Sequence, residues 1–177
     1  EVQEGVISYN KLPIGNISLN SMREQIGDHM TMERLFEGTI LDNITLGREM
    51  ANFENVKWAI KELGLTEFIK STPHGYNTIL QTQGKGLPES IVTKLLLARS
   101  IAARPKLLLL ENPFEHIELD DCRDIIDFLT AKENGWSIVT VSPNRYLAER
   151  SDKIVIMKSG EIEAMGTYKQ LIENQKL

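Results

Sequence analysis

Apolar residues recur along much of this chain at helical spacing. In Phe53–Leu63 they fall three or four positions apart, which places them on one face of a helix. The same spacing predicts a second amphipathic helix over Asp120–Lys132. A third helix is expected over Glu89–Ala103, because Pro88 suits its first turn and Pro105 follows its end.

Short, nearly continuous apolar runs predict the strands. Lys106–Leu110 and Ser137–Val141 have the character of buried strands in a parallel sheet, whereas Lys153–Met157 and Glu161–Ala164 flank a turn. Pro73–Gly86, with its glycines, predicts an exposed loop. Strands that alternate with helices indicate an α/β fold with a mainly parallel sheet and flanking helices. The side chains that we expect to be buried are Leu97, Ile101, Leu107, Leu108, Leu109, Val139, Val141, Ile154 and Ile156.

The composition is that of an ordinary globular domain. The chain has 177 residues, of which 41% are apolar, and this length predicts one domain. Its formal net charge of -5 argues against nucleic-acid binding, which requires clustered positive charge. Cys122 is the single cysteine, so no internal disulfide can form and a reducing compartment is favoured. The first residue is Glu1 rather than Met, which suggests a piece of a longer protein.

A candidate site follows the strand predicted over Lys106–Leu110. Glu111 and Asn112 come directly after it. In open α/β sheets, ligands bind beyond the carboxyl ends of the strands. An acid there can hold Mg²⁺, and a second polar group can position a water molecule. The alternative is that these are simply the polar residues of an exposed strand end.

Five collinear segments resemble the nucleotide-binding domain of ATP-binding cassette (ABC) transporters. The first of them is most similar to the exporter branch, including peptide and toxin secretion systems. The resemblance covers nearly the whole chain and implies a P-loop NTPase-like fold, with the N-terminal portion of the family domain missing. The segments are LFEGTILDNITLG at Leu35–Gly47, PHGYNTI at Pro73–Ile79, LARSIAARP at Leu97–Pro105, KLLLL at Lys106–Leu110 and DKIVIMKSGEIEAMGT at Asp152–Thr167.

The resemblance also implies an organisation and a set of partners. Residues 1–177 would form a single, partial nucleotide-binding domain, with a helical subdomain over about residues 31–90 that receives the membrane subunit. The implied ligands are ATP and Mg²⁺. The implied partners are a transmembrane domain or subunit and a second nucleotide-binding domain, at the cytoplasmic face of the membrane. Because this subdomain is rich in apolar residues, we expect it to leave an apolar groove for the membrane subunit.

The hydrolytic positions of that family are altered here. Its phosphate-binding loop, G-x-x-x-x-G-K-[ST], is absent from the chain and in the family would lie upstream of Glu1. Thr31 occupies the position of the metal-contacting Gln. Glu111 replaces the Asp that holds Mg²⁺, and Asn112 replaces the Glu that polarises the attacking water. Pro143 stands at the position of the switch His and cannot donate a hydrogen bond.

The family's signature segment, L-S-G-G-Q, is altered as well. In the family it caps the ATP that is bound to a partner domain. Here Pro88 lacks an amide hydrogen and Glu89 adds a negative charge, both of which oppose anion binding. The alternative is an ordinary Pro-Glu helix start. The aligned residues are Leu87, Pro88, Glu89, Ser90 and Ile91.

Together these residues predict a transporter ATP-binding domain that keeps its fold and coupling surface but hydrolyses ATP poorly or not at all. An alternative is an interaction module that docks to the membrane subunit without binding nucleotide. A third is an active ATPase that a segment upstream of Glu1 would complete. Other side chains are expected to have ordinary roles: His29 solvated, Cys122 unreactive beside two acids, and Trp58 and Trp136 as packing residues.

Overall fold

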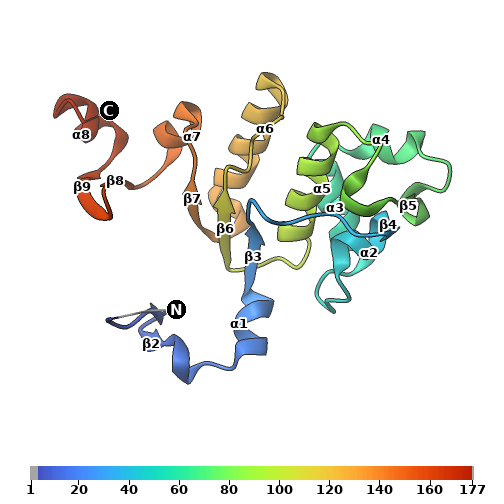
Figure 1. Cartoon of the computed structure of the whole chain (residues 1–177), viewed down its shortest axis with the longest axis horizontal. Coiled ribbons are helices and arrows are strands. Elements are labelled where there is room, and N and C mark those ends of the chain that lie inside the picture. The colour runs from blue at the N-terminus through green and yellow to red at the C-terminus, as the bar shows by residue number, and fades with distance from the viewer. Residues whose placement is uncertain (1–3, 177) are drawn as a thin grey trace.

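Three parallel strands lie at the centre of the fold (Figure 1). The computed structural model of the protein describes residues 4–176. Strand β6 (Leu107–Glu111) pairs on one side with β3 (Ile26–His29) and on the other with β7 (Ser137–Val141), and both pairings are parallel. The predicted α/β fold with a mainly parallel sheet is therefore confirmed.

The helix α5 (Glu89–Ile101) packs directly against β3. A Cβ atom at Gly27 would lie 1.9 Å from the carbonyl oxygen of Ser100, so only glycine permits this close approach. Leu97 and Ile101, which were predicted to be buried, have 0% exposure. This helix thus connects the sheet to the rest of the hydrophobic core.

Three short helices gather on the far side of α5 from the sheet (Figure 1). They are α2 (Ile40–Thr45), α3 (Phe53–Glu62) and α4 (Thr66–Ser71). A capping box begins α2, in which the side chains and backbone amides of Thr39 and Asp42 bond reciprocally. The helix predicted over Phe53–Leu63 is confirmed as α3.

The remaining elements flank this centre. Helix α6 contributes to the core, and the β8–β9 hairpin confirms the two strands predicted around a turn. In Figure 1 the hairpins at the two ends of the chain lie away from helices α2–α4. Among the helices of residues 4–176, none is long and apolar enough to cross a membrane. The remaining bounds are β1 (Ser8–Tyr9), β2 (Leu12–Pro13), η1 (Ile14–Asn16), α1 (Leu19–Gln25), β4 (Gly38–Thr39), η2 (Gly75–Asn77), β5 (Ile79–Leu80), η3 (Thr82–Gly84), α6 (Leu119–Thr130), η4 (Lys132–Asn134), α7 (Arg145–Arg150), β8 (Ile154–Lys158), β9 (Glu161–Gly166) and α8 (Tyr168–Glu173).

Part of the predicted core is wrong. Leu108 is fully buried as expected, but Val139 and Val141 on β7 are 60% and 70% exposed. The reason is that β7 is an edge strand of the three-stranded sheet in the described chain. An apolar run does not reveal whether its strand lies at the centre or at the edge of a sheet. The other departures are residues that are only partly buried: Leu107, Leu109, Ile154 and Ile156.

The segment Pro73–Gly86 is not the wholly exposed loop that its glycines predict. It contains β5, which pairs antiparallel with β4, and Leu80 on β5 is 4% exposed. A Cβ atom at Gly84 would come within 2.7 Å of Val92 on α5, so part of this segment packs closely on the helix. Two-residue strands are too short to produce a visible sequence period.

Candidate functional site

The carboxyl ends of β3, β6 and β7 meet at one edge of the sheet, because all three strands run in the same direction. Glu111 ends β6, while Thr31 and Pro143 follow β3 and β7 closely. The backbone N–H of Asn112 donates to the carbonyl oxygen of Val141 at 2.9 Å, which extends the ladder beyond the strand. The fold therefore gathers Thr31, Glu111, Asn112 and Pro143 at the predicted edge.

Thr31 holds the carboxylate of Glu111. Its backbone N–H donates to Glu111 Oε2 at 3.0 Å. Hydrogen bonds from the backbone and side chain of Thr31 lower the pKa of the Glu111 carboxyl, so this group is ionised at neutral pH. Thr31 thus positions an acid at this edge of the sheet.

Glu111 is a suitable ligand for Mg²⁺. This ion takes oxygen ligands and is often held by one or two carboxylates together with water and substrate phosphates. Within residues 4–176, no cluster of three or more His, Cys, Asp or Glu residues could hold a metal ion. Glu111 would therefore contribute one ligand among the described residues, and other oxygen ligands would complete the coordination.

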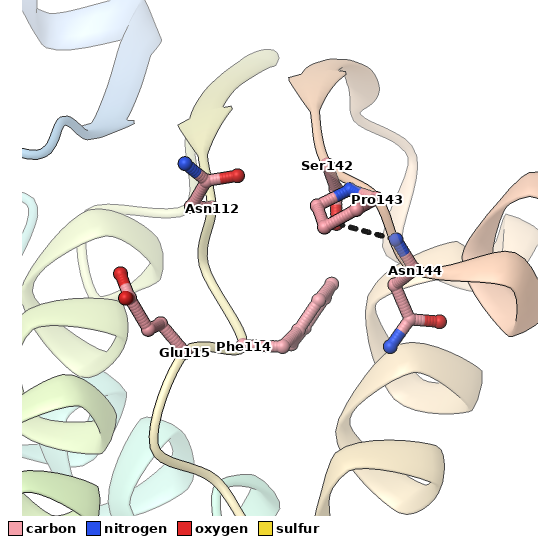
Figure 2. A pocket seen from close by; sticks show the side chains of 6 residues that line it. All are labelled: Asn112, Phe114, Glu115, Ser142, Pro143 and Asn144. Carbon is pink, nitrogen blue, oxygen red and sulfur yellow. Dashed lines mark hydrogen bonds between the residues drawn. The ribbon is translucent and has the colours of Figure 1, made fainter.

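Asn112 and Pro143 line the same cavity, which has a volume of about 330 Å³. In Figure 2, Asn112 and Glu115 lie on one side and Pro143 and Asn144 on the other, with Phe114 between them. The hydroxyl of Ser142 accepts a hydrogen bond from the backbone N–H of Asn144 at 3.2 Å. Amides and a hydroxyl can bind and orient a polar ligand, but they are poor proton acceptors at neutral pH.

Two backbone and side-chain details further define this cavity. Asn112 has a φ of 44°, in the left-handed region that asparagine tolerates better than glutamate. Glu115 is the one carboxylate among the lining residues, but its side chain is 65% exposed and lies 3.9 Å from His116. The cavity therefore has binding groups and a single solvated acid.

The signature-like residues lie elsewhere. They form the start of α5, where Pro88 and Glu89 are exposed and the carbonyl oxygen of Pro88 accepts bonds from the amides of the first turn. None of Leu87, Pro88, Glu89 and Ser90 lines the cavity at the sheet edge. The fold thus does not bring this segment to the cavity that Asn112 and Pro143 line.

His29 is buried, so the prediction of a solvated side chain is wrong. It is 7% exposed, because the β3 pleat directs it to the same buried face as Gly27. Burial is the main cause that lowers its pKa, and Nδ1 has no hydrogen-bond partner among the described residues. Cys122 is buried too, and burial, rather than the neighbouring acids, is what raises the pKa of its thiol.

A buried polar network behind the site was not predicted. Asn43 is 0% exposed and exchanges hydrogen bonds of 3.0 Å with the backbone of Phe36. Arg99 donates from Nε to the carbonyl oxygen of Asn43 at 2.7 Å and from Nη2 to its Oδ1 at 3.2 Å. The sequence gives little signal for this pair, because Asn43 lies beside Asp42 in ILDNIT and Arg99 lies beside Ser100 in LLLARSI.

Glu33 lies at the edge of this network. Its Oε2 is 3.9 Å from Nη1 of Arg99. Burial, followed by the nearby carboxylate of Asp28, raises the pKa of Glu33 to about 7. The network therefore fastens the segment between β3 and β4, which includes Thr31, to α2 and α5.

Comparisons with known proteins support a single family. No family model matches the chain. The uncharacterized ABC transporter ATP-binding proteins YfiC and YknU of Bacillus subtilis are 29% and 31% identical over 99% and 96% of the chain. The cyclolysin secretion/processing ATP-binding protein CyaB of Bordetella pertussis is 30% identical over 90% of it. The chain spans 29%, 29% and 22% of the lengths of these relatives.

The fold agrees with this sequence similarity. A bacterial Atm1-family ABC exporter solved with ATP bound superposes with a TM-score of 0.90 at 24% identity, over 99% of this chain and 31% of that one. The resemblance noted in the sequence is therefore confirmed: the homologues of this chain are ATP-binding proteins of ABC transporters, and its fold is the nucleotide-binding fold of an ABC exporter.

Proposed function

We propose that the chain is the ATP-binding domain of an ABC exporter whose own hydrolytic site is degenerate. The observation that supports this most directly is the cavity shared by Asn112 and Pro143. In the family, a carboxylate and a histidine at these positions polarise water and contact the γ-phosphate. Asn112 is a poor proton acceptor, Pro143 cannot donate a hydrogen bond, and both face the same cavity.

ATP and Mg²⁺ are the proposed ligands. Glu111 would hold the ion through the carboxylate that Thr31 orients. The phosphate-binding loop is not part of this sequence, so this chain alone is expected to bind nucleotide weakly. In the domain as we propose it, binding of nucleotide would drive coupling to transport, and hydrolysis would occur at a partner's site.

The proposed partners are a transmembrane domain or subunit and a second nucleotide-binding domain, at the cytoplasmic face of the membrane. We assign docking to a helical subdomain of about residues 31–90. Its helices bury Val56, Ile60 and Leu63, but other apolar side chains stay exposed, as at a binding surface. Those exposed side chains are Met32, Phe36, Leu46, Met50, Phe53 and Ile79.

The test of degeneracy is ATP hydrolysis by the full-length protein in the presence of Mg²⁺. We expect turnover attributable to this chain's cavity to be absent, so Glu115→Gln should leave the rate unchanged. Glu115→Gln is included because Glu115 is the one acid that lines the cavity. Turnover that Glu115→Gln abolishes would show that this site hydrolyses ATP and would overturn the proposal.

The alternative is an interaction module that docks without binding nucleotide. It is favoured by the exposed start of α5, where Pro88 and Glu89 replace anion-binding groups. Titration of the full-length protein with a fluorescent ATP analogue separates the two functions. Saturable binding that Glu111→Ala weakens supports the degenerate ATP-binding domain. Unaltered capture of the membrane subunit with no such binding supports the interaction module.

A further inference from the structure

Residues 30–37 connect β3 to β4 and contain no helix or strand. The backbone of this connecting segment is fastened to neighbouring elements at several points. The N–H of Thr31 donates to Glu111 Oε2 at 3.0 Å. Further along, Nη1 of Arg99 on α5 donates to the carbonyl oxygen of Arg34 at 3.2 Å. How firmly the segment is held therefore decides how well Thr31 orients Glu111.

Glu33 lies in the middle of the connecting segment and faces inward. Its side chain is only 21% exposed, and its Oε2 lies 3.9 Å from Nη1 of Arg99. The carboxylate of Asp28 on β3 is within hydrogen-bonding reach of the Glu33 carboxyl. When Glu33 is protonated it can donate to Asp28, whereas two ionised carboxylates at this place repel each other. The contact between the segment and β3 thus depends on one proton.

The other charged or titratable groups around this pair come from every element that packs there. They are His29 on β3, Arg34 in the segment, Arg48 after α2, Arg99 on α5 and Glu111 at the end of β6. The cation of Arg99 opposes protonation of Glu33, but burial and Asp28 outweigh it and raise the pKa of Glu33 to about 7. Glu33 therefore changes its charge close to neutral pH.

We propose that Glu33, Asp28 and Arg99 form a proton-dependent latch that holds the connecting segment while Glu33 is protonated and lets it open more often when Glu33 is ionised. Because the segment carries Thr31, opening also loosens the hydrogen bond that orients Glu111. The latch rests on these contacts and not on the proposed transport function.

The direction of the pH effect follows from linkage. Local opening brings the Glu33 carboxyl into water, where its pKa returns towards 4.5, so the closed segment binds the proton more tightly than the open one. The closed form is therefore favoured at low pH, and opening becomes easier as the pH rises towards 7. His29 is retained in every variant below, so its own titration cancels in the comparison.

Hydrogen exchange of backbone amides, measured by mass spectrometry on the whole chain at pH 6 and pH 8, tests the latch. Each rate is divided by that of an unstructured peptide of the same sequence at the same pH. We expect amides of residues 30–37 to lose protection about three- to tenfold between the two pH values, because one proton is linked to opening. Amides of β6 and α5 should change much less.

Three variants identify the proton. Glu33→Gln keeps a neutral donor to Asp28 but has no proton to lose, so we expect the pH-dependent loss of protection to disappear. Asp28→Asn leaves Glu33 titratable but removes the neighbouring carboxylate, so the loss should shrink to about twofold. The control is Glu37→Gln, an exposed position in the same segment, which should keep the full wild-type loss.

The latch is overturned by any of three results. The first is an equal loss of protection in wild type and Glu33→Gln. The second is disappearance of the loss in Glu37→Gln, since removal of any charge from the segment would then suffice. The third is an equal loss in β6 and α5, because the whole fold rather than the segment would then respond to pH.

Discussion

Replacing Glu33 with glutamine should reduce the pH dependence of folding stability. Burial and the carboxylate of Asp28 raise the pKa of Glu33 from 4.5 to about 7, although Arg99 opposes this shift. Glu33 Oε2 is buried and has no hydrogen-bond partner among the described residues. Ionising this side chain in the folded protein is therefore unfavourable relative to ionising it in the unfolded chain.

The sign and size of the effect follow from linkage. Because the pKa in the folded state is raised, the folded protein binds a proton more tightly than the unfolded chain does. The contribution of protonated Glu33 to the unfolding free energy is fully present below a pH of about 4.5. It is lost as the pH rises towards 7. One pKa unit corresponds to about 1.4 kcal/mol, so the upper limit is roughly 3 kcal/mol. Partial solvent access reduces this, and we expect about 1–3 kcal/mol.

Denaturant unfolding at pH 5 and pH 8 measures the effect. Glutamine imitates the protonated carboxyl. The unfolding free energy of Glu33→Gln minus that of the wild type should therefore be larger at pH 8 than at pH 5. His29, whose lowered pKa acts in the opposite sense, is common to both proteins and cancels. Glu37→Gln, at an exposed position, controls for the loss of one charge. An identical pH dependence of wild type and Glu33→Gln would refute the argument.

Two further predictions concern stability. Leu108→Ala should lower the unfolding free energy by about 2–5 kcal/mol, because this side chain is 0% exposed on the central strand, and Leu109→Ala should cost less because it is only partly buried. Asn43→Ala should cost about 2–4 kcal/mol in the same denaturant titration, because it removes the Oδ1 that accepts from the Phe36 amide and from Nη2 of Arg99 in a buried place. A loss below about 1 kcal/mol for either Leu108→Ala or Asn43→Ala would contradict its assigned role.

The helices were predictable because their apolar spacing reports which face packs inward. The spacing in Phe53–Leu63 and the two prolines around α5 placed both helices within a few residues of their bounds. Strand burial was less predictable. Ser137–Val141 has the composition of a central strand, yet β7 is an edge strand in the described chain. The position of a strand in a sheet depends on its neighbours, which periodicity does not encode.

The candidate site was partly predictable for a similar reason. Parallel strands bring their carboxyl ends together, so Glu111, Asn112 and Pro143 were expected at one edge once the fold was assigned. The bond between Thr31 and Glu111 depends on the course of the segment after β3, which no local pattern specifies. The pairing of Asn43 with Arg99 joins residues 56 positions apart and was likewise not visible in the sequence.

The residues that stabilise the fold differ from those that line the cavity in this chain. Asn43 and Arg99 are buried, so their replacement leaves polar groups without partners and destabilises the fold. Asn112 and Pro143 are exposed at the cavity, where a substitution removes few contacts. Asparagine also suits the φ of 44° at position 112, and a glutamate there would add about 1–2 kcal/mol of backbone strain. The fold is therefore compatible with the loss of hydrolysis that we propose, because the residues that hold the sheet edge together are not those that would perform the chemistry.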